Sequence, residues 1–342
     1  MILGSLMPKK IPWRDVLTYL ISLGFGIGLL IYTFRGVSLL ELRAELINIR
    51  YQYLILFILI VFLGTFLRAL RWKYMLITFK NEIKIVNLLN ATIFGYGVNV
   101  ILPRVGEIAR ALYIGAKEGI SRSSSLGTII VERVIDLIFL ILSVLISIMA
   151  FGKKLESEYP WIYQSFYLGI FILIVSFVLL YLVIKYQNEI LLTIEKFFKR
   201  YNFTFLNKAS EISSKIIDGF GSIKTLRNYF FIFIFSLFLW FTYAFGSYIG
   251  LLMLGMDKIQ NVNLFNGIMI MSITTFGIMI PIPGSTGSYH ALCKSVLTMI
   301  LGFSIQISLV YAILTHLLNT IPFLIITIIL ILRQGMSKII KN

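Results

Sequence analysis

Long apolar runs recur along the whole chain, and they constrain its fold more than any other feature of the sequence. A bilayer core of about 30 Å is crossed by about 20 helical residues, and most of the runs reach that length. The runs cover residues 16–34, 51–67, 85–102, 124–151, 161–184, 228–255, 264–280, 285–302 and 306–332. Because 58% of the residues are hydrophobic and 13% are charged, a water-exposed globular fold is excluded. The sequence predicts an all-helical polytopic membrane protein.

Composition also limits the cofactors and partners. Cys293 is the only cysteine and there are two histidines, so neither a disulfide nor a metal site is expected. The formal net charge of +16 comes from Lys and Arg residues that collect between the apolar runs, which is typical of membrane topology rather than of nucleic-acid binding. We therefore expect one membrane domain across residues 1–342, with no cofactor, no metal and no nucleic-acid partner.

Three of the runs are too punctuated for helices that face lipid. Residues 85–102 contain several Asn and Gly residues and are followed by Pro103, and the two runs within 264–302 are divided by a Pro- and Gly-rich segment from 281 to 287. Irregular backbone at membrane depth is tolerated only where protein shields it. We expect these runs to form broken or re-entrant helical hairpins.

The basic connections suggest the topology. Both chain ends and the connections 68–84, 104–122 and 185–227 are basic, which places them on the cytoplasmic side of a plasma (inner) membrane. A run 85–102 that crossed the membrane would put two basic connections on opposite faces, whereas a re-entrant run would not. The same reasoning brings the hairpin 264–302 in from outside. The prediction is about six full spans and two hairpins, with inverted halves 51–151 and 228–332 linked by spans and an amphipathic cytoplasmic segment across 161–227.

Three charged residues lie in the first third of the run 124–151. Glu132, Arg133 and Asp136 would each cost about 2.5–3.5 kcal/mol at the bilayer centre, so they are expected to face the protein interior. Arg133 and Asp136, three residues apart, can pair, while Glu132 needs a cation from elsewhere, with Arg110 or Arg104 as the first candidates. Two interpretations stay open: a buried ion-pair clamp that fixes helix register, or a site that receives an anionic phosphate headgroup with the amides of a helix start after Pro103.

For the other polar residues, a structural role competes with a functional one. Arg68 and Arg71, next to Trp72, are typical of interfacial anchors, with headgroup contact as the alternative. The segment 281–287 could cradle a polar group or form an exposed turn. A hydrogen-bonded His290 with a snorkelling Lys294 is expected, and His316 and Asn319 are expected to join helices.

Four motifs follow one another along the chain. They are Arg68-x-x-Arg71-Trp72, Asn99-x-x-x-Pro103-Arg104-x-Gly106-Glu107-x-x-Arg110, Glu132-Arg133-x-x-Asp136 and Pro281-x-Pro283-Gly284-x-x-Gly287. Together they resemble the transmembrane region of the lysylphosphatidylglycerol synthase/flippase family, the membrane half of the multiple peptide resistance factor proteins. The resemblance covers essentially the whole chain and implies a flippase-like fold that moves aminoacylated or other polar-headgroup lipids between leaflets.

The resemblance also implies which residues form the substrate site. These are Asn99, Pro103, Arg104, Gly106, Glu107, Arg110, Glu132, Arg133, Asp136, Pro281, Pro283, Gly284, Gly287 and His290, with Arg68 and Arg71 as headgroup contacts. Two features depart from the family pattern. His290 stands where the family usually has a Glu, and the soluble aminoacyl-transferase domain of the synthases is missing from these residues, so the chain is not expected to aminoacylate lipid.

The sequence therefore predicts a lipid flippase or related transporter whose partners are the bilayer and a polar-headgroup lipid, with a homo-oligomer or a separate lipid synthase as further partners. A membrane glycosyltransferase or other lipid-modifying enzyme is the enzymatic alternative, and it would rely on Glu107, Glu132 and Asp136. A non-catalytic membrane partner of a separate synthase and a solute or ion transporter are the others.

Overall fold

The chain is helical throughout the part that the structure describes. A computed structural model describes residues 13–35, 39–47, 49–156, 160, 162–186, 189 and 225–335, and no strand occurs among them. The helices are α1 Trp13–Phe34, α2 Leu39–Ile47, α3 Tyr51–Leu76, α4 Ile85–Ile101, α5 Val105–Glu118, α6 Arg122–Leu155, α7 Ile162–Lys185, α10 Leu226–Met253, α11 Leu264–Met279, α12 Ser288–Ser295 and α13 Ile305–Gln334. Short helical turns are η2 Met256–Lys258, η3 Pro283–Ser285 and η4 Val296–Ile300.

Five helical segments are long and apolar enough to cross a membrane. They are Leu17–Phe34, Tyr51–Leu76, Arg122–Lys153, Leu226–Met253 and Ile305–Arg333. The segments Ile85–Ile101, Tyr163–Ser176 and Leu264–Met279 are apolar but shorter. The all-helical, multi-pass prediction is therefore confirmed. Most of the predicted amphipathic segment between residues 185 and 227 lies outside the described residues.

Short polar side chains set several helix starts. Ser121, Thr225 and Ser304 each accept a hydrogen bond from a main-chain N–H three residues later, at the starts of α6, α10 and α13. Asn263 and Asn266 form a reciprocal capping box at the start of α11. Such caps satisfy amides that a helix leaves without partners in its first turn. The long apolar runs consequently begin as helices where the sequence places Ser, Thr or Asn before them.

The helices α4 and α5 form a hairpin that returns to the end from which it starts. The carboxylate of Glu118, the last residue of α5, accepts hydrogen bonds from the side chain of Asn87 at 2.6 Å and from the N–H of Lys84 at 3.2 Å. Lys84 directly precedes α4, so the start of α4 and the end of α5 lie together. The chain therefore turns back after the run 85–102, but the returning arm is α5 and lies outside the predicted run.

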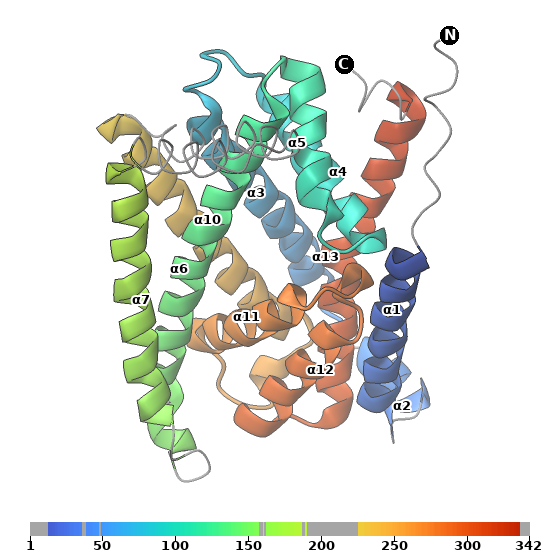
Figure 1. Cartoon of the computed structure of the whole chain (residues 1–342). Coiled ribbons are helices and arrows are strands. Elements are labelled where there is room, and N and C mark those ends of the chain that lie inside the picture. Colours follow the sequence, from blue (N-terminus) through green and yellow to red (C-terminus); the bar gives the residue numbers. More distant parts are fainter. Residues whose placement is uncertain are drawn as a thin grey trace.

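The second broken segment also returns to its starting end. Gln260, before α11, donates a hydrogen bond to the carbonyl oxygen of Leu301, just after η4, at 2.7 Å. This end of the molecule holds the start of α3, because the Arg50 N–H donates to the carbonyl of Met253 at 2.9 Å. The first hairpin lies at the other end of α3 (Figure 1), so the two hairpins approach each other from opposite ends of that helix.

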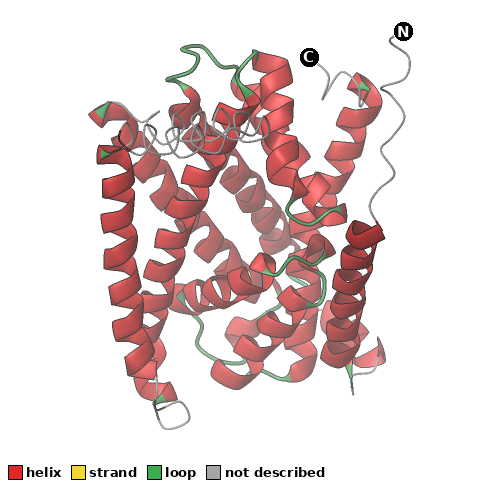
Figure 2. Ribbon diagram, viewed as in Figure 1, coloured by secondary structure: helices red, strands yellow, loops and turns green. Residues whose placement is uncertain are grey.

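The tips of the hairpins meet in the middle of the bundle. The α4–α5 and α11–α12 loops both lie at mid-height in Figure 2, and the Arg104 guanidinium donates to the carbonyl of Met279 at 2.6 Å. Each hairpin packs against the long helix that follows the other hairpin: α4 packs on α13, and α11 packs on α6. The helices α3 and α10 pack along each other. Ile282 and Pro283 of the second tip are buried, whereas Leu102 of the first tip and Pro281 of the second keep exposed surface.

Candidate functional site

Three arginines converge on two carboxylates of α6. Arg110 of α5 contacts Glu132 at 3.0 Å. From α3, Arg68 lies 3.1 Å from Glu132 and 3.2 Å from Asp136, and Arg71 lies 3.4 Å from Glu132 and 2.8 Å from Asp136. The four-residue spacing of the two acids places both on one face of α6. The cluster therefore ties α3, α5 and α6 together, and it resolves the predicted partner of Glu132 as Arg110 rather than Arg104.

Most side chains of this cluster are buried within the protein. Arg71 and Glu132 have no exposed side-chain area, and Arg68 and Arg110 are buried. The buried Trp72 donates to Thr128 at 2.9 Å. The expectation that Arg68 and Arg71 are interfacial anchors is therefore wrong, because the carboxylates of α6, which are remote in sequence, draw both arginines inward.

The edge of the cluster remains accessible. The side chain of Arg133 is 46% exposed, and it lies 3.7 Å from Asp136 and 3.9 Å from Glu107, which is 29% exposed. The predicted pair of Arg133 with Asp136 is thus present, but Arg71 and Arg68 hold Asp136 more closely. Four arginines (Arg68, Arg71, Arg110 and Arg133) face three carboxylates (Glu107, Glu132 and Asp136), which leaves one surplus positive charge.

The first hairpin tip uses Asn99 and Gly106 to close on itself. The Asn99 side-chain oxygen accepts from the N–H of Gly106 at 2.7 Å, and its amide donates to Glu107 at 3.4 Å. A Cβ on Gly106 would come within 2.0 Å of the carbonyl oxygen of Gly95, so glycine is required where α4 and α5 cross. One of the helix-start amides that were expected to receive a phosphate is therefore occupied by Asn99.

Arg104 sits apart from the cluster. It follows Pro103 and has a φ of 65°, a left-handed conformation that is uncommon for a residue other than glycine. Its exposed side chain reaches the carbonyl of Met279, at the end of α11. Arg104 thus connects the two hairpin tips.

The second hairpin tip contains Pro281, Pro283, Gly284, Gly287 and His290. Pro281 is exposed and Pro283 is buried, and Gly284 and Gly287 have φ values of 58° and 97°. A Cβ on Gly287 would lie 2.3 Å from the carbonyl oxygen of Gly26, so this glycine lets α1 approach. Its N–H donates to His290 Nδ1 at 3.4 Å. The segment is a packed tip rather than an exposed turn.

Histidine and lysine fix the surroundings of this tip. His316 of α13, which was expected to join helices, contacts the carbonyl of Gly284 through Nε2 at 2.7 Å, and its ring lies 4.7 Å from that of His290. Lys294 donates to the carbonyl of Thr33 at 2.9 Å. His316 was missed as a site residue, since only the fold brings it beside His290.

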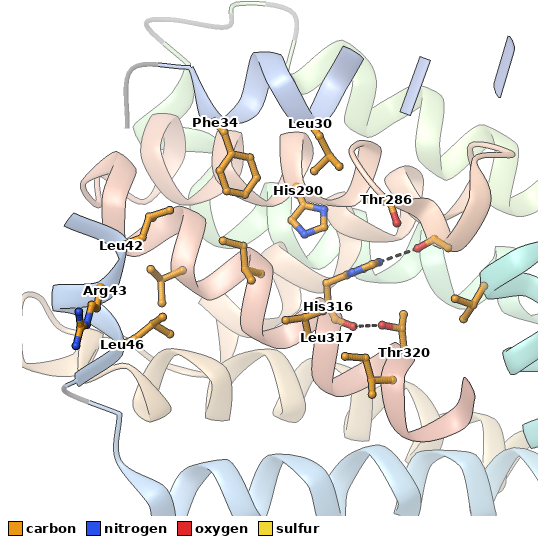
Figure 3. A pocket seen from close by; sticks show the side chains of 15 residues that line it. Leu30, Phe34, Leu42, Arg43, Leu46, Thr286, His290, His316, Leu317 and Thr320 are labelled. Atoms are coloured by element: carbon orange, nitrogen blue, oxygen red, sulfur yellow. Dashed lines mark hydrogen bonds between the residues drawn. The ribbon is translucent and has the colours of Figure 1, made fainter. Parts of the chain in front are cut away.

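A groove of about 610 Å³ lies at this second tip, between α1, α2, α12 and α13. Most of its lining is apolar, as Figure 3 shows. Its polar lining residues are Arg43, Thr286, His290, His316 and Thr320. Val100, near the end of α4, also lines it, so the groove reaches the contact between the tips. Arg43 and α2 were not predicted from the sequence, and α1 was expected only as an apolar run, not as part of a site.

The groove and the arginine–carboxylate cluster are distinct places. None of the cluster residues lines the groove among the residues that the structure describes. Glu132 has no exposed side-chain area, so it is not a carboxylate that a donor molecule reaches directly. Of the residues that were predicted to form one site, Gly284 and His290 line the groove, and Glu107, Arg110, Glu132, Arg133 and Asp136 form the cluster.

Comparison with known proteins gives two similarities. Residues 19–327 match the family described as the lysylphosphatidylglycerol synthase TM region. The chain is also similar to the UPF0104 membrane protein MJ1595 of Methanocaldococcus jannaschii, with 23% identity over 225 residues. That alignment covers 63% of this chain and 63% of the length of the relative.

Proposed function

Because this chain belongs to the family of the lysylphosphatidylglycerol synthase transmembrane region, we propose that it is a flippase-like transporter that moves polar-headgroup lipids between leaflets. The observation that carries the proposal is the meeting of two broken hairpins, approaching from opposite ends of α3, beside a groove with an apolar lining and a few polar residues. Discontinuous helices that meet near the bilayer midplane are a common way to build a transport site.

The arrangement of elements supports an inverted repeat. The order of a long helix, two short helices and a long helix occurs in α3–α6 and again in α10–α13. In this proposal the halves 51–151 and 228–332 have opposite orientations, both chain ends are cytoplasmic, and the membrane is the plasma membrane. Together with α1 and α7 they give six full spans and two re-entrant hairpins.

We assign different roles to the two parts of the predicted site. The buried residues Arg68, Arg71, Arg110 and Glu132 fix α3, α5 and α6 relative to one another. Arg104, Glu107 and Arg133 keep exposed surface and the cluster has a surplus positive charge, so they are the residues that a phosphate headgroup contacts on its way. Arg104 holds the tips together in the observed state, and transport requires that this contact be made and broken.

Transport is tested with the purified chain in vesicles that contain a trace of fluorescent phosphatidylglycerol. Dithionite bleaches only outer-leaflet label in protein-free vesicles, so the expected result is additional bleaching at a rate that grows with protein content. Bleaching that matches protein-free vesicles, with correctly folded protein present, contradicts the proposal. A covalently altered lipid after incubation with a polyprenyl-phosphate sugar would favour the glycosyltransferase alternative instead.

A pair of matched variants connects flux to the hairpin tips. Arg104→Gln removes the contact with Met279 and should slow flux by about tenfold while melting stays close to wild type, because the lost bond is made by an exposed side chain. Arg333→Gln makes the same chemical change in the last turn of α13 and should leave flux unchanged. Equal flux in the two variants would remove Arg104 from the mechanism.

A further inference from the structure

We infer that the groove binds the headgroup of an anionic phospholipid and discriminates against a headgroup that carries an amine. This inference rests on the proposed transport function, because it names the class of lipid that the transporter takes. The argument uses the charges, the hydrogen-bonding capacity and the apolar surface of the residues that line the groove.

Charge is the first reason. No Asp or Glu occurs among the described residues that line the groove, whereas Arg43 stands exposed on α2. An arginine offers a fork of N–H donors that matches a phosphate. An aminoacyl headgroup would bring an ammonium group near this arginine, and no described residue of the groove lining offers a carboxylate to receive it. Such like-charge juxtaposition is a usual basis of discrimination.

Hydrogen bonding at His290 points the same way. A main-chain N–H can only donate, so the bond from Gly287 requires an unprotonated Nδ1 and places the proton of a neutral His290 ring on Nε2. His290 therefore offers a donor, and a phosphodiester only accepts. His290 is also the third residue of α12, where a Glu or Gln side chain can cap the preceding amide equally well. Histidine keeps the cap without adding a negative charge to the groove.

Apolar surface identifies the ligand as a lipid rather than a free phosphate. Leu46, Leu317 and Ile321 line the groove and remain 40–44% exposed. A volume of about 610 Å³ is within the range of sites that enclose a small molecule. A water-soluble anion gains nothing from such a wall, whereas an acyl chain buries it.

The test is a binding competition on the full chain in detergent, read by native mass spectrometry. The probes are phosphatidylglycerol and lysyl-phosphatidylglycerol with identical acyl chains. We expect phosphatidylglycerol to bind about tenfold more tightly, which corresponds to about 1.4 kcal/mol. His290→Glu should shift the ratio about tenfold toward the lysyl lipid, while His290→Gln, which caps α12 without a charge, should keep the wild-type ratio.

A second variant and a soluble competitor keep the test decisive. Arg43→Gln, at an exposed position, should weaken phosphatidylglycerol binding several-fold without changing the fold. Glycerophosphoglycerol, the headgroup without chains, should not compete. Equal binding of the two lipids, preference for the lysyl lipid, an unchanged ratio in His290→Glu, or efficient competition by the soluble headgroup would each overturn the inference.

The outcome is separable from that of the transport proposal. Selective binding without flux in vesicles would refute transport and leave the selectivity of the groove intact. Flux without selective binding would refute only the selectivity.

Discussion

The two hairpins use their polar residues in opposite ways. At the first hairpin, the arginines and carboxylates are turned toward one another and are mostly buried. At the second, the histidines border an open groove and bond to the main chain of the tip rather than to a charged partner. Burying an ion pair costs desolvation energy, and removing one of its partners is strongly destabilising. We therefore regard the first region as a scaffold. The second region has polar capacity left for a ligand.

The largest expected effect comes from removing the acid at the centre of the scaffold. Glu132→Gln keeps the shape of the side chain but removes the charge from a carboxylate that three arginines contact at 3.0–3.4 Å. Arg110 then loses its acidic partner, while Arg68 and Arg71 keep Asp136. We expect a loss of about 3–5 kcal/mol in the free energy of unfolding, measured as a lower melting temperature and a poor yield. Ser236→Ala, which removes one 3.2 Å bond from Arg71, should cost about 1 kcal/mol. A Glu132→Gln protein as stable as wild type would mean that the cluster is not a scaffold.

The next effect tests the close crossing within the first hairpin. Gly106→Ala would place a Cβ 2.0 Å from the carbonyl of Gly95 and should destabilise the protein by about 1–3 kcal/mol. Gly24→Ala is the matched control, because nothing lies within 4 Å of its new Cβ and alanine favours a helix interior by about 1 kcal/mol. The melting temperatures of the two variants should move in opposite directions, and a shared direction would contradict the packing.

A smaller effect concerns the base of the first hairpin and depends on pH. Burial raises the pKa of the Glu118 carboxyl, but hydrogen bonds from Lys80, Asn87 and the N–H of Lys84 lower it more, so its net pKa lies below the ordinary value. A depressed pKa contributes stability above the unfolded pKa that is lost as the pH falls through the folded pKa. Acidification from pH 7 to pH 3 should therefore lower the melting temperature more in wild type than in Glu118→Gln, by the equivalent of about 1 kcal/mol. Parallel pH profiles would show that this carboxylate does not hold the hairpin base.

The smallest effect separates the edge of the scaffold from its centre. Arg133→Ala should change the free energy of unfolding by no more than about 0.5 kcal/mol, because Asp136 is already held by Arg71 at 2.8 Å and Arg68 at 3.2 Å. The measurement is the melting temperature beside that of Glu132→Gln. Similar losses in both variants would show that the cluster has no inner and outer part.

Much of the fold followed from local pattern. The length of the apolar runs predicts the long helices, and the interruption at Pro103 together with the balance of basic connections predicts that residues 85–102 turn back. The interval from Gly97 to Pro103 equals that from Gly277 to Pro283, but the glycines serve different contacts. A Cβ on Gly97 would meet Thr327 of α13, whereas one on Gly277 would meet Ser288 of its own hairpin.

The candidate site was predictable only in part. Glu132 and Asp136 had to face inward because charge is expensive in lipid, and Arg110 was among the expected partners. The burial of Arg68 and Arg71 could not be read from their own neighbourhood, since it depends on carboxylates more than sixty residues away. Arg43 gave no local signal, and His316 was expected only to join helices, because a groove is formed by the spacing between helices.

By itself the sequence determined that this chain is a helical membrane protein with two broken segments and a set of charges that must be shielded, because hydropathy, helix length and the cost of charge in lipid are local properties. Only the tertiary structure decided which charges meet, that the two tips touch through Arg104 and Met279, and that the open groove lies at His290 and His316 rather than at the arginines. Those outcomes depend on how separate helices pack, and packing is a property of pairs of segments that no single segment encodes.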